Sequence, residues 1–465
     1  MKRLFGTDGI RSVAGQYPLD APTVYAIGLA LAHHLGSFPS VVLGMDTRES
    51  SPVIAAQLTS GLTQGGATVE SAGVITTPAI AHLTHTHGFA AGVVISASHN
   101  PWEDNGIKIF GPDGYKLPDA TELAIEDEIF KHLKEPGSQN AGAPGPALSD
   151  VERVASETWV SQDAPEVNES DRADYIRFLL AAVPGLSLDN RRIVIDCANG
   201  AASAVAPELF AQLGGADVII THASPDGRNI NEHCGALHPE IVAGAVRHYN
   251  ASLGITFDGD ADRALFADEN GNVVNGDAVL LLAARDLQAR GLLTNATVVA
   301  TTMSNMGLEA ALKRSGIQML RAAVGDKYVL EQMLATNAAL GGEQSGHIIF
   351  SGRSTTGDGL LTALLLLDIV HRSGKSLSEL IADLKVFPQV IVNVKVREKK
   401  PLDGIPSVAQ AIAAAEKELA DSGRVVIRYS GTEALARVMI EAESEPLMRH
   451  HADTIANAIR AELGL

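Results

Sequence analysis

RIVIDCANGAASAVAPELFAQLGGADVIITHASPDG, residues 192–227, contains the order of elements that decides the fold. A β-branched run leads through a loop of small and polar residues into a helical stretch, and a second apolar run ends at Pro, Asp and Gly. Two stretches repeat this pattern, VVLGMDTRESSPVIAAQL from Val41 and TVVATTMSNMGLEAALKRSGIQMLRAAVGD from Thr297. Each is typical of a β-loop-α-β unit, so the sequence predicts three similar α/β domains with mixed sheets.

The chain has 465 residues, too many for one hydrophobic core. A stretch rich in Pro, Gly and Ala, KEPGSQNAGAPGPALSD at 134–150, predicts a connection after the first domain. Beyond Ser373, the runs VIVNVKV, RVVIRYS and ALARVMIEA predict strands of a smaller α+β domain. We therefore expect four domains, over residues 1–145, 151–272, 273–373 and 376–465.

The charge balance excludes some partners. There are 55 acidic and 36 basic residues, a formal net charge of −19 that repels nucleic acid and anionic membranes. No apolar run reaches the roughly 20 residues of a membrane span, and the first residues do not resemble a secretion signal. With only two cysteines, the composition predicts a cytoplasmic protein without nucleic-acid or membrane partners. A small phosphate ester could still bind to a local arginine cluster.

An acidic segment, ITFDGDADR, follows an apolar run and carries Asp258, Asp260 and Asp262. In an extended chain alternate side chains point the same way, so the three carboxylates would converge. Such a set of hard oxygen ligands suits Mg²⁺. A solvated acidic turn is the alternative, whereas an EF-hand is disfavoured because Arg263 and Glu269 occupy its Gly and Glu positions.

A second segment, AAGVVISASHNP, delivers Ser98 to a turn before Pro101. The surrounding residues lack the G-x-S-x-G pattern of a hydrolase elbow. A serine beside a metal site is better explained as a phosphoryl carrier, although the motif alone could be a turn. His99 could hold the loop by a hydrogen bond or act as a base.

Two glycine-containing loops complete the candidate sites. In RYSGTEALAR, backbone amides, hydroxyls and arginines could clamp a phosphate, or the arginines could only form salt bridges; the residues are Arg428, Ser430, Gly431, Thr432 and Arg437. In GGEQSGH, Glu343 and Ser345 offer groups that suit sugar hydroxyls.

Five motifs, FGTDGIR, SASHNP, DGDADR, GEQSGH and RYSGTE, occur in this order over nearly the whole chain. With them the sequence resembles the α-D-phosphohexomutase superfamily. The resemblance implies four domains around a central cleft, which contribute in turn the phosphoserine, metal-binding, sugar-recognition and phosphate-binding loops. DCANGAA, PDGRNINEHCGALHPE and VGDKYVLE are similar to the branch that acts on glucosamine phosphates. The nearest alternative is the branch acting on mannose and glucose phosphates.

The resemblance also implies roles for individual residues. Ser98 would be a phosphoserine and, through its phosphate, join the three aspartates as a ligand of one Mg²⁺ per subunit. Around the transferring phosphoryl group would lie Arg11, Lys108 and Arg263, with Lys108 and His347 as candidates for proton transfer. The implied substrate contacts are His99, Glu343, Ser345, Arg428, Ser430, Gly431, Thr432 and Arg437.

The implied reaction converts glucosamine 6-phosphate to glucosamine 1-phosphate through a glucosamine 1,6-bisphosphate intermediate. Its product would feed UDP-N-acetylglucosamine synthesis and cell-wall assembly, and a homodimer is a family-level expectation. Three positions depart from the family pattern: Ala261 replaces a commoner Gly, Tyr429 a Lys and Ala434 a Pro. Two other hypotheses stay open, a metal-dependent phosphatase with Asp258 as nucleophile and a sugar-phosphate binder without activity.

Overall fold

The computed structural model describes residues 4–134, 166–215, 217–429 and 434–464. The chain forms two compact units, a main unit of residues 1–302 and 320–381 and a C-terminal unit of residues 303–319 and 382–465. Apart from Lys134, the predicted connection over 134–150 lies outside the described residues. Within the described ranges, no helix has the length and apolar character needed to cross a membrane.

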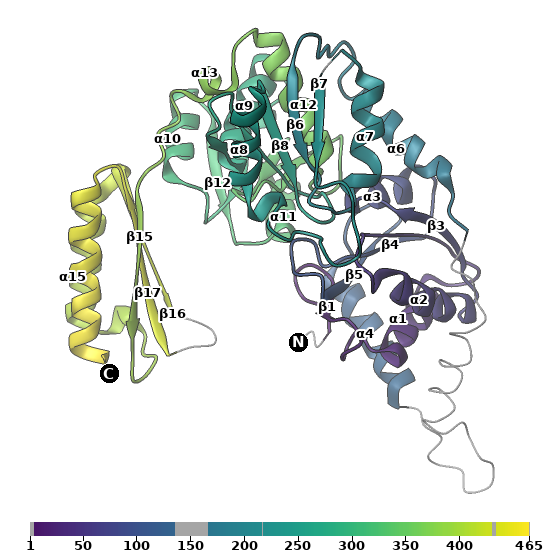
Figure 1. Ribbon diagram of the computed structural model, residues 1–465. Helices are drawn as coiled ribbons and strands as arrows, with labels where there is room; N and C mark the ends of the chain where they lie inside the picture. Colours follow the sequence, from purple (N-terminus) through teal and green to yellow (C-terminus); the bar gives the residue numbers. More distant parts are fainter. Residues whose placement is uncertain (1–3, 135–165, 216, 430–433, 465) are drawn as a thin grey trace, which may run out of the picture. The chain divides into compact units, whose positions relative to one another are not determined.

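The first sheet of the main unit has five strands in the order β1-β5-β4-β2-β3 (Figure 1). Its strands are β1 (Ile10–Val13), β2 (Ser40–Met45), β3 (Thr68–Val74), β4 (Ala91–Ile95) and β5 (Asp104–Phe110). β2 is parallel to β3 and β4, whereas β5 is antiparallel to both β1 and β4. The sheet is therefore mixed, and the turn between β4 and β5 holds Ser98.

Helices cover both faces of this sheet. α1 (Ala21–Leu35), α2 (Ser51–Gln64) and α4 (Asp119–Lys134) share one apolar core with it. α3 (Thr77–Thr86) packs on β2 and β4 from the other side. α3 approaches closely because β4 has a glycine at position 92, where a Cβ atom would lie 1.9 Å from Thr84 Oγ1. α3 begins where the Thr76 side chain accepts a hydrogen bond from the Ala79 N–H.

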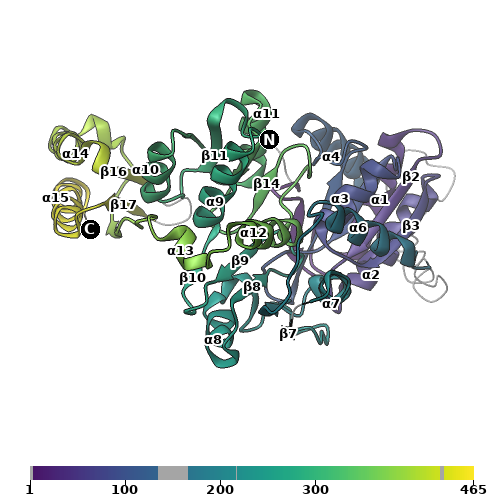
Figure 2. The ribbon, with the colours of Figure 1, turned by 90° about the horizontal axis from the view of Figure 1, so that it is seen from above.

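The second sheet has the order β10-β9-β8-β6-β7. Its strands are β6 (Arg192–Asp196), β7 (Asp217–Thr221), β8 (Leu253–Phe257), β9 (Ala264–Ala267) and β10 (Val273–Val274), and its helices are α6 (Glu169–Ala181), α7 (Ala202–Leu213) and α8 (Pro239–Tyr249). α8 packs on β6, β8 and β9, and Figure 2 shows α8 next to β8. The turn from β8 to β9 carries the three aspartates.

The third sheet has the order β12-β11-β13-β14. Its strands are β11 (Thr297–Thr301), β12 (Gln318–Ala322), β13 (Leu340–Gly342) and β14 (Ile348–Phe350), and the helices around it are α9 (Gly276–Ala289), α11 (Asp326–Thr336), α12 (Gly359–Ser373) and α13 (Leu377–Ile381). α11 packs on β11 and β13. The turn from β13 to β14 contains Glu343 and Ser345.

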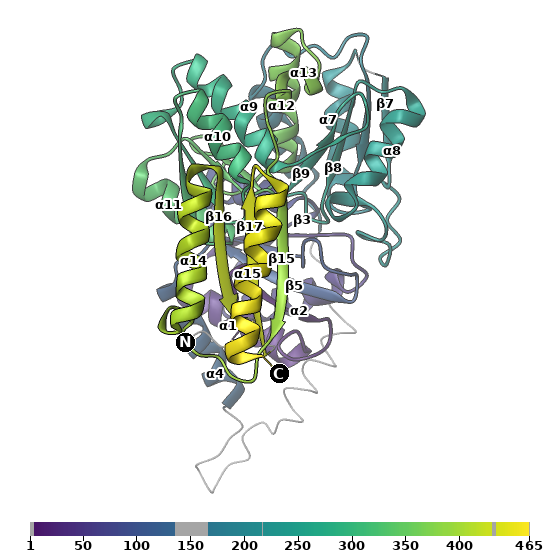
Figure 3. The ribbon, with the colours of Figure 1, turned by 90° about the vertical axis from the view of Figure 1, so that its left-hand side faces the viewer.

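The C-terminal unit contains an antiparallel sheet in the order β15-β17-β16. Its elements are β15 (Gln389–Lys395), α14 (Pro406–Leu419), β16 (Gly423–Tyr429), β17 (Leu435–Ala442) and α15 (Glu445–Leu463). Figure 3 shows α14 and α15 side by side over one face of the sheet, where they share its apolar core. α10 (Met306–Arg314) belongs to this unit, and the Met306 N–H donates to Glu441 Oε1 at 2.8 Å.

The fold class predicted from the sequence is confirmed. Three α/β domains with mixed sheets precede a smaller domain of three strands and two long helices. The strands expected after Ser373 are β15, β16 and β17. The exact domain boundaries and the cleft shared by all four domains stay predictions.

The crossing of α1 and α2 depends on two facing glycines. A Cβ atom at Gly61 would lie 2.1 Å from the Tyr25 carbonyl oxygen, and one at Gly28 would lie 2.3 Å from that of Leu58. We expect Gly61→Ala to lower the free energy of unfolding by about 1–3 kcal/mol, because the helices must separate. Chemical denaturation of the full chain measures this.

Gly244→Ala in α8 is the matched control, since the nearest atom to its added Cβ is 3.9 Å away. It should raise stability by about 0.5–1 kcal/mol, the usual gain for Ala over Gly within a helix. A Gly61→Ala protein as stable as the Gly244→Ala protein would contradict the close helix crossing.

Candidate active site

Ser98 lies in the turn after β4 and is 1% exposed. Its φ is +55°, in the left-handed region that non-glycine residues seldom adopt. The Ser98 N–H donates to Ser96 Oγ at 2.9 Å. The turn therefore presents the serine in a strained conformation that its surroundings must hold.

The three aspartates lie between β8 and β9 and are almost fully buried, with exposures of 0%, 0% and 4% in chain order. One oxygen from each lies within 4.8 Å of the others, so the carboxylates converge as expected. The backbone conformation that brings them together differs from the extended segment that the sequence predicted. The chain turns here, the Ala261 N–H donates to the Asp258 carbonyl at 3.1 Å, and Ala261 has φ +56°. Glycine adopts such a left-handed φ without steric strain, so a glycine would also fit this position.

Ser98 and Asp258 meet across two domains. Ser98 Oγ donates to Asp258 Oδ2 at 2.6 Å. Burial, reinforced by the charges of Asp262 and Asp260, raises the pKa of Asp258 well above its usual value. A carboxylate in such a place needs a compensating positive charge to stay ionised.

The donor set fits a hard divalent cation. Asp260 Oδ1 and Asp262 Oδ1 are buried and accept no hydrogen bond from the described part of the chain. Buried carboxylate oxygens are rarely left without a partner. Oxygen-only ligands with the Ser98 hydroxyl beside them are the donors that Mg²⁺ prefers. The residues therefore suit a metal ion at this point.

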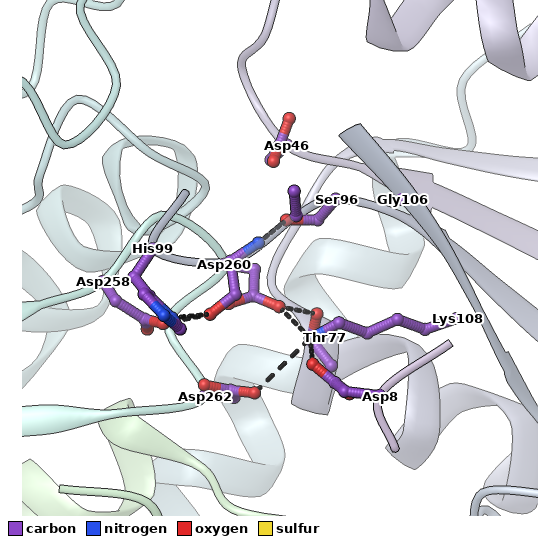
Figure 4. A network of polar contacts seen from close by, with 12 residues as sticks. Asp8, Asp46, Thr77, Ser96, His99, Gly106, Lys108, Asp258, Asp260 and Asp262 are labelled. Atoms are coloured by element: carbon purple, nitrogen blue, oxygen red, sulfur yellow. Dashed lines mark hydrogen bonds and ion pairs between the residues drawn. The ribbon is translucent and has the colours of Figure 1, made fainter. Parts of the chain in front are cut away.

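Lys108 supplies a fixed cation to the cluster. It extends from β5 toward Asp8, Asp260 and Asp262, with Nζ to oxygen distances of 3.1, 2.7 and 3.5 Å (Figure 4). Burial disfavours the charged amine, but these carboxylates outweigh it and raise the pKa of Lys108. Thr77 Oγ1 also donates to Asp260 Oδ2, at 2.6 Å. The Lys108 side chain is therefore held in its charged ammonium form.

Two arginines flank Ser98. Arg11 on β1 donates to the Ala97 carbonyl at 3.3 Å and pairs with Asp8. Arg263 Nη1 lies 3.1 Å from His99 Nδ1, which is also 3.2 Å from Ser98 Oγ. Burial, then Arg263 and Arg11, lower the pKa of His99 to about 4. A neutral His99 whose Nδ1 accepts from Arg263 holds the loop and is poorly placed to take the serine proton.

A cavity of about 380 Å³ opens beside these groups. This volume is within the usual range for small-molecule sites. Its charged and titratable lining brings together predicted residues of the first three domains with two that were not predicted, Asp8 and Asp326. The predicted ones are Arg11, His99, Asp262, Arg263, Glu343 and His347. The predicted residues of these domains that are not part of this lining are Ser98, Lys108, Asp258, Asp260 and Ser345.

The third domain contributes ordered acceptors. Glu343 accepts hydrogen bonds from the Gly325 N–H at 3.2 Å and from Ser345 Oγ at 3.1 Å. Ser345 thereby orients Glu343. His347 Nε2 accepts from the Gly357 N–H at 3.0 Å, and its Nδ1 lies 3.6 Å from Asp262 Oδ2. Burial opposes the charged imidazole, but Asp262 outweighs it and raises the pKa of His347.

The predicted phosphate-binding residues belong to the C-terminal unit. Arg428 on β16 and Arg437 on β17 are cross-strand partners. The side chains therefore start from neighbouring positions at one end of the hairpin. Ser430, Gly431 and Thr432 lie outside the described residues.

Sequence reasoning missed a clamp on the Ser98 carbonyl, formed by Arg48 and Asn231. Arg48 Nη2 donates to the carbonyl oxygens of Ser98 and Asn100 at 3.2 and 2.6 Å. Asn231 Nδ2 donates to the same two oxygens at 3.0 and 3.2 Å. Asp46 pairs with Arg48, which is 1% exposed. These contacts hold the strained serine in place. The only signal in the sequence was an arginine in DTRES, the segment that directly follows the apolar run of β2.

A second missed group is a chain of alternating charges. Lys116 bridges Asp8 from the N-terminal loop and Asp326 at the start of α11. Burial opposes the charged form of both Lys116 and Asp8, yet their partners outweigh it, raising the pKa of Lys116 and lowering that of Asp8. The chain joins the first and third domains beside the cavity. The acidic residue in FGTDGIR was its only sequence signal.

Four successive domains, with a strand-end serine facing three buried carboxylates, define a multidomain α/β enzyme of the phosphohexomutase class. Four family models match the chain in order. They describe phosphoglucomutase/phosphomannomutase alpha/beta/alpha domain I at residues 2–135, domain II at 173–271, domain III at 275–387 and the C-terminal domain at 391–458. The chain belongs to the phosphoglucomutase/phosphomannomutase family.

Curated relatives match over the full length. The phosphoglucosamine mutase of Koribacter versatilis is 58% identical over 474 residues, which cover 100% of this chain and 98% of the relative. The phosphoglucosamine mutase of Solibacter usitatus is 52% identical over 467 residues, covering 100% and 99%. Relatives so named thus share the whole domain series.

Solved structures share the fold. A phosphoglucomutase/phosphomannomutase family protein from Burkholderia thailandensis has a TM-score of 0.76 at 23% identity, covering 99% of both chains. The Aspergillus fumigatus N-acetylphosphoglucosamine mutase in complex with GlcNAc-6P and magnesium has a TM-score of 0.62 at 23% identity, covering 99% of this chain and 96% of that one.

The carbonyl clamp predicts a specific cost for losing its amide donor. Asn231→Asp keeps the size of the side chain and its tolerance of a left-handed φ of +59°, but it replaces the donor with an acceptor. We expect the free energy of unfolding to fall by about 1–3 kcal/mol. Asn190→Asp, at an exposed position with φ +61°, is the control and should change little. Equal losses in chemical denaturation would count against the clamp.

The carboxylate cluster predicts that divalent cations stabilise the folded chain. Wild type should melt several degrees higher with Mg²⁺ or Mn²⁺ than with a chelator, because the ion binds the folded state. Asp260→Asn should lose most of this shift in a thermal melt. Asp421→Asn, whose side chain is 97% exposed, should keep it. A shift of full size in Asp260→Asn would exclude the cluster as the binding site.

Proposed function

We propose that this chain is a phosphoglucosamine mutase, which interconverts glucosamine 6-phosphate and glucosamine 1-phosphate through phosphorylated Ser98. The observation that carries the mechanism is the 2.6 Å hydrogen bond from Ser98 Oγ to Asp258, at a point where three buried carboxylates meet. A hydroxyl so placed can carry a phosphoryl group beside a metal-binding cluster.

The substrate proposal rests on the relatives. Proteins 58% and 52% identical to this chain over its whole length bear the name phosphoglucosamine mutase. A fungal N-acetylphosphoglucosamine mutase of the same fold has been crystallised with GlcNAc-6P and magnesium. These names favour an amino-sugar phosphate over mannose or glucose phosphates.

In the first half-reaction, the bond between Ser98 Oγ and phosphorus breaks while a sugar hydroxyl oxygen forms a new bond to phosphorus. The hydroxyl proton passes to a base, the departing Ser98 Oγ takes up a proton, and glucosamine 1,6-bisphosphate is formed. After the sugar turns over, Ser98 Oγ loses its proton and attacks the other phosphate. The bond between that phosphorus and its sugar oxygen breaks, and the sugar oxygen takes up a proton to give glucosamine 1-phosphate and phosphorylated Ser98. Asp258 Oδ2 already accepts the serine O–H and so orients Oγ.

Charge around Ser98 supports phosphoryl transfer. Arg11 and Arg263 line the cavity, and Lys108 forms an ion pair with Asp260 of the carboxylate cluster. Cations at such positions stabilise negative charge on the transferring group. Mg²⁺ held by Asp258, Asp260 and Asp262, when bound, would supply further positive charge to the phosphoryl oxygens.

Of the two predicted proton-transfer groups, His347 fits the role better. It lines the cavity, whereas its Nε2 accepts the Gly357 N–H, a hydrogen bond that would have to break before Nε2 could take a proton. Lys108 is 1% exposed and surrounded by carboxylates, so it is better suited to fixing charge. Glu343, oriented by Ser345, is the proposed acceptor for sugar hydroxyls.

The proposal includes three further parts. The loop at 430–432, with Arg428 and Arg437, would bind the phosphate that is not reacting. The protein would work in the cytoplasm, and its product would enter UDP-N-acetylglucosamine synthesis. A homodimer is retained as the expected assembly.

The first test compares kcat/KM of wild type and Ser98→Ala for glucosamine, mannose and glucose phosphates, with Mg²⁺ and catalytic sugar bisphosphate. We expect a preference for glucosamine phosphate and a loss of at least about a thousandfold in Ser98→Ala, because the covalent carrier is removed. Ser351→Ala, in an exposed turn, is the control and should keep full activity.

Other outcomes would redirect the proposal. Higher efficiency with mannose or glucose phosphate would favour the sister mutase activity. Release of inorganic phosphate that survives Ser98→Ala would favour a phosphatase with Asp258 as nucleophile. A folded wild type that binds sugar phosphates without turnover would leave only a binding protein.

A further inference from the structure

Two histidines and a glutamate form a separate cluster on the first domain. Glu128 and His132 are four residues apart on α4 and so project from one face of the helix. His33 lies in the last turn of α1, which packs against α4. One ligand atom from each side chain lies within 4.8 Å of the others. None of the three residues belongs to the candidate active site.

Two of the distances in this cluster are close to the edges of a tetrahedral zinc site. His132 Nε2 and His33 Nδ1 lie 3.4 and 3.7 Å from the same oxygen, Glu128 Oε1. Zinc bonds of about 2.0–2.1 Å in a tetrahedron place neighbouring ligand atoms about 3.4 Å apart. His132 Nε2 is buried and has no hydrogen-bond partner in the described ranges.

The second oxygen of the glutamate has a different partner. Lys131 Nζ donates to Glu128 Oε2 at 2.7 Å, which orients the carboxylate and leaves Oε1 toward both imidazoles. The imidazole planes are tilted by 57° with centroids 5.4 Å apart, so the rings do not stack. Both nitrogens can therefore face a common point.

We propose that His33, Glu128 and His132 bind a Zn²⁺ ion that ties α1 to α4, with a solvent water as fourth ligand. Two imidazoles and one carboxylate suit zinc, whereas Mg²⁺ prefers an octahedron of oxygens. The ligand side chains are 46%, 29% and 23% exposed, so the ion can enter from solvent. Helices α1 and α4 hold the ligands on rigid elements.

The test titrates ZnCl₂ into the full chain by calorimetry, with excess Mg²⁺ present to occupy the carboxylate cluster. One zinc ion should bind per chain, and the thermal midpoint should rise with zinc. His33→Ala and His132→Ala should each weaken zinc binding by at least about tenfold. Losing a residue that only hydrogen-bonds to a metal ligand already lowers metal affinity by about this factor, and here a ligand itself is removed.

His34→Ala is the matched control, because His34 is the exposed neighbour of His33 on the same helix and is not in the cluster. It should bind zinc like wild type. The variants' thermal midpoints without zinc, which should equal that of wild type, verify folding. No zinc binding by folded wild type, or unchanged binding in both cluster variants, would overturn the proposal. Turnover with Mg²⁺ alone should be the same in all these proteins, so this result is independent of the proposed mutase activity.

Discussion

Mutual repulsion among three buried carboxylates is the constraint on which the main unit depends. Asp258, Asp260 and Asp262 are brought together by a turn that follows a buried strand, and burial of unpaired charge would cost several kcal/mol per group. Lys108 offsets part of this cost through its contacts with Asp260 and Asp262. Asp260 Oδ1 and Asp262 Oδ1 accept no hydrogen bond from the residues that the structure describes, so a cation is a natural further component.

The same constraint explains why three distant segments meet at one place. Lys108 comes from β5, which pairs with β1, and Asp8 in the loop before β1 shares this lysine with the cluster. Lys116 then continues the alternation to Asp326 at the start of α11. Asp8, Asp260, Asp262 and Asp326 thus each have a basic neighbour from another segment, and the cavity lies against this chain of charges.

Much of the fold was predictable, because β-branched runs and glycine-rich loops report local structure directly. The repeated β-loop-α-β pattern gave the α/β domains, and the alternating runs after Ser373 gave β15 to β17. The convergence of the aspartates was also expected, but for the wrong geometric reason. The segment is a turn with a left-handed residue at Ala261, and a side-chain alternation rule has no information about such a φ.

The rest of the site could not be predicted because it depends on long-range contacts. Arg48 and Asn231 have no recognisable spacing, since 183 positions separate them (231 minus 48), and only tertiary packing brings both to the Ser98 carbonyl. Lys116 likewise has no distinguishing feature in the sequence, because its partners Asp8 and Asp326 are distant along the chain. Local patterns identify reactive groups, whereas the groups that hold them emerge only from the fold.

The contacts around Ser98 also limit which parts of the enzyme can move. Asn231 from the second domain holds the serine turn of the first, while Thr77 and Lys108 from the first domain hold Asp260 of the second. A hinge between these two domains would have to break all these bonds together. The serine and the carboxylates therefore form a stationary frame, and in the proposed mechanism the entropic cost of turning the intermediate over would fall on the sugar.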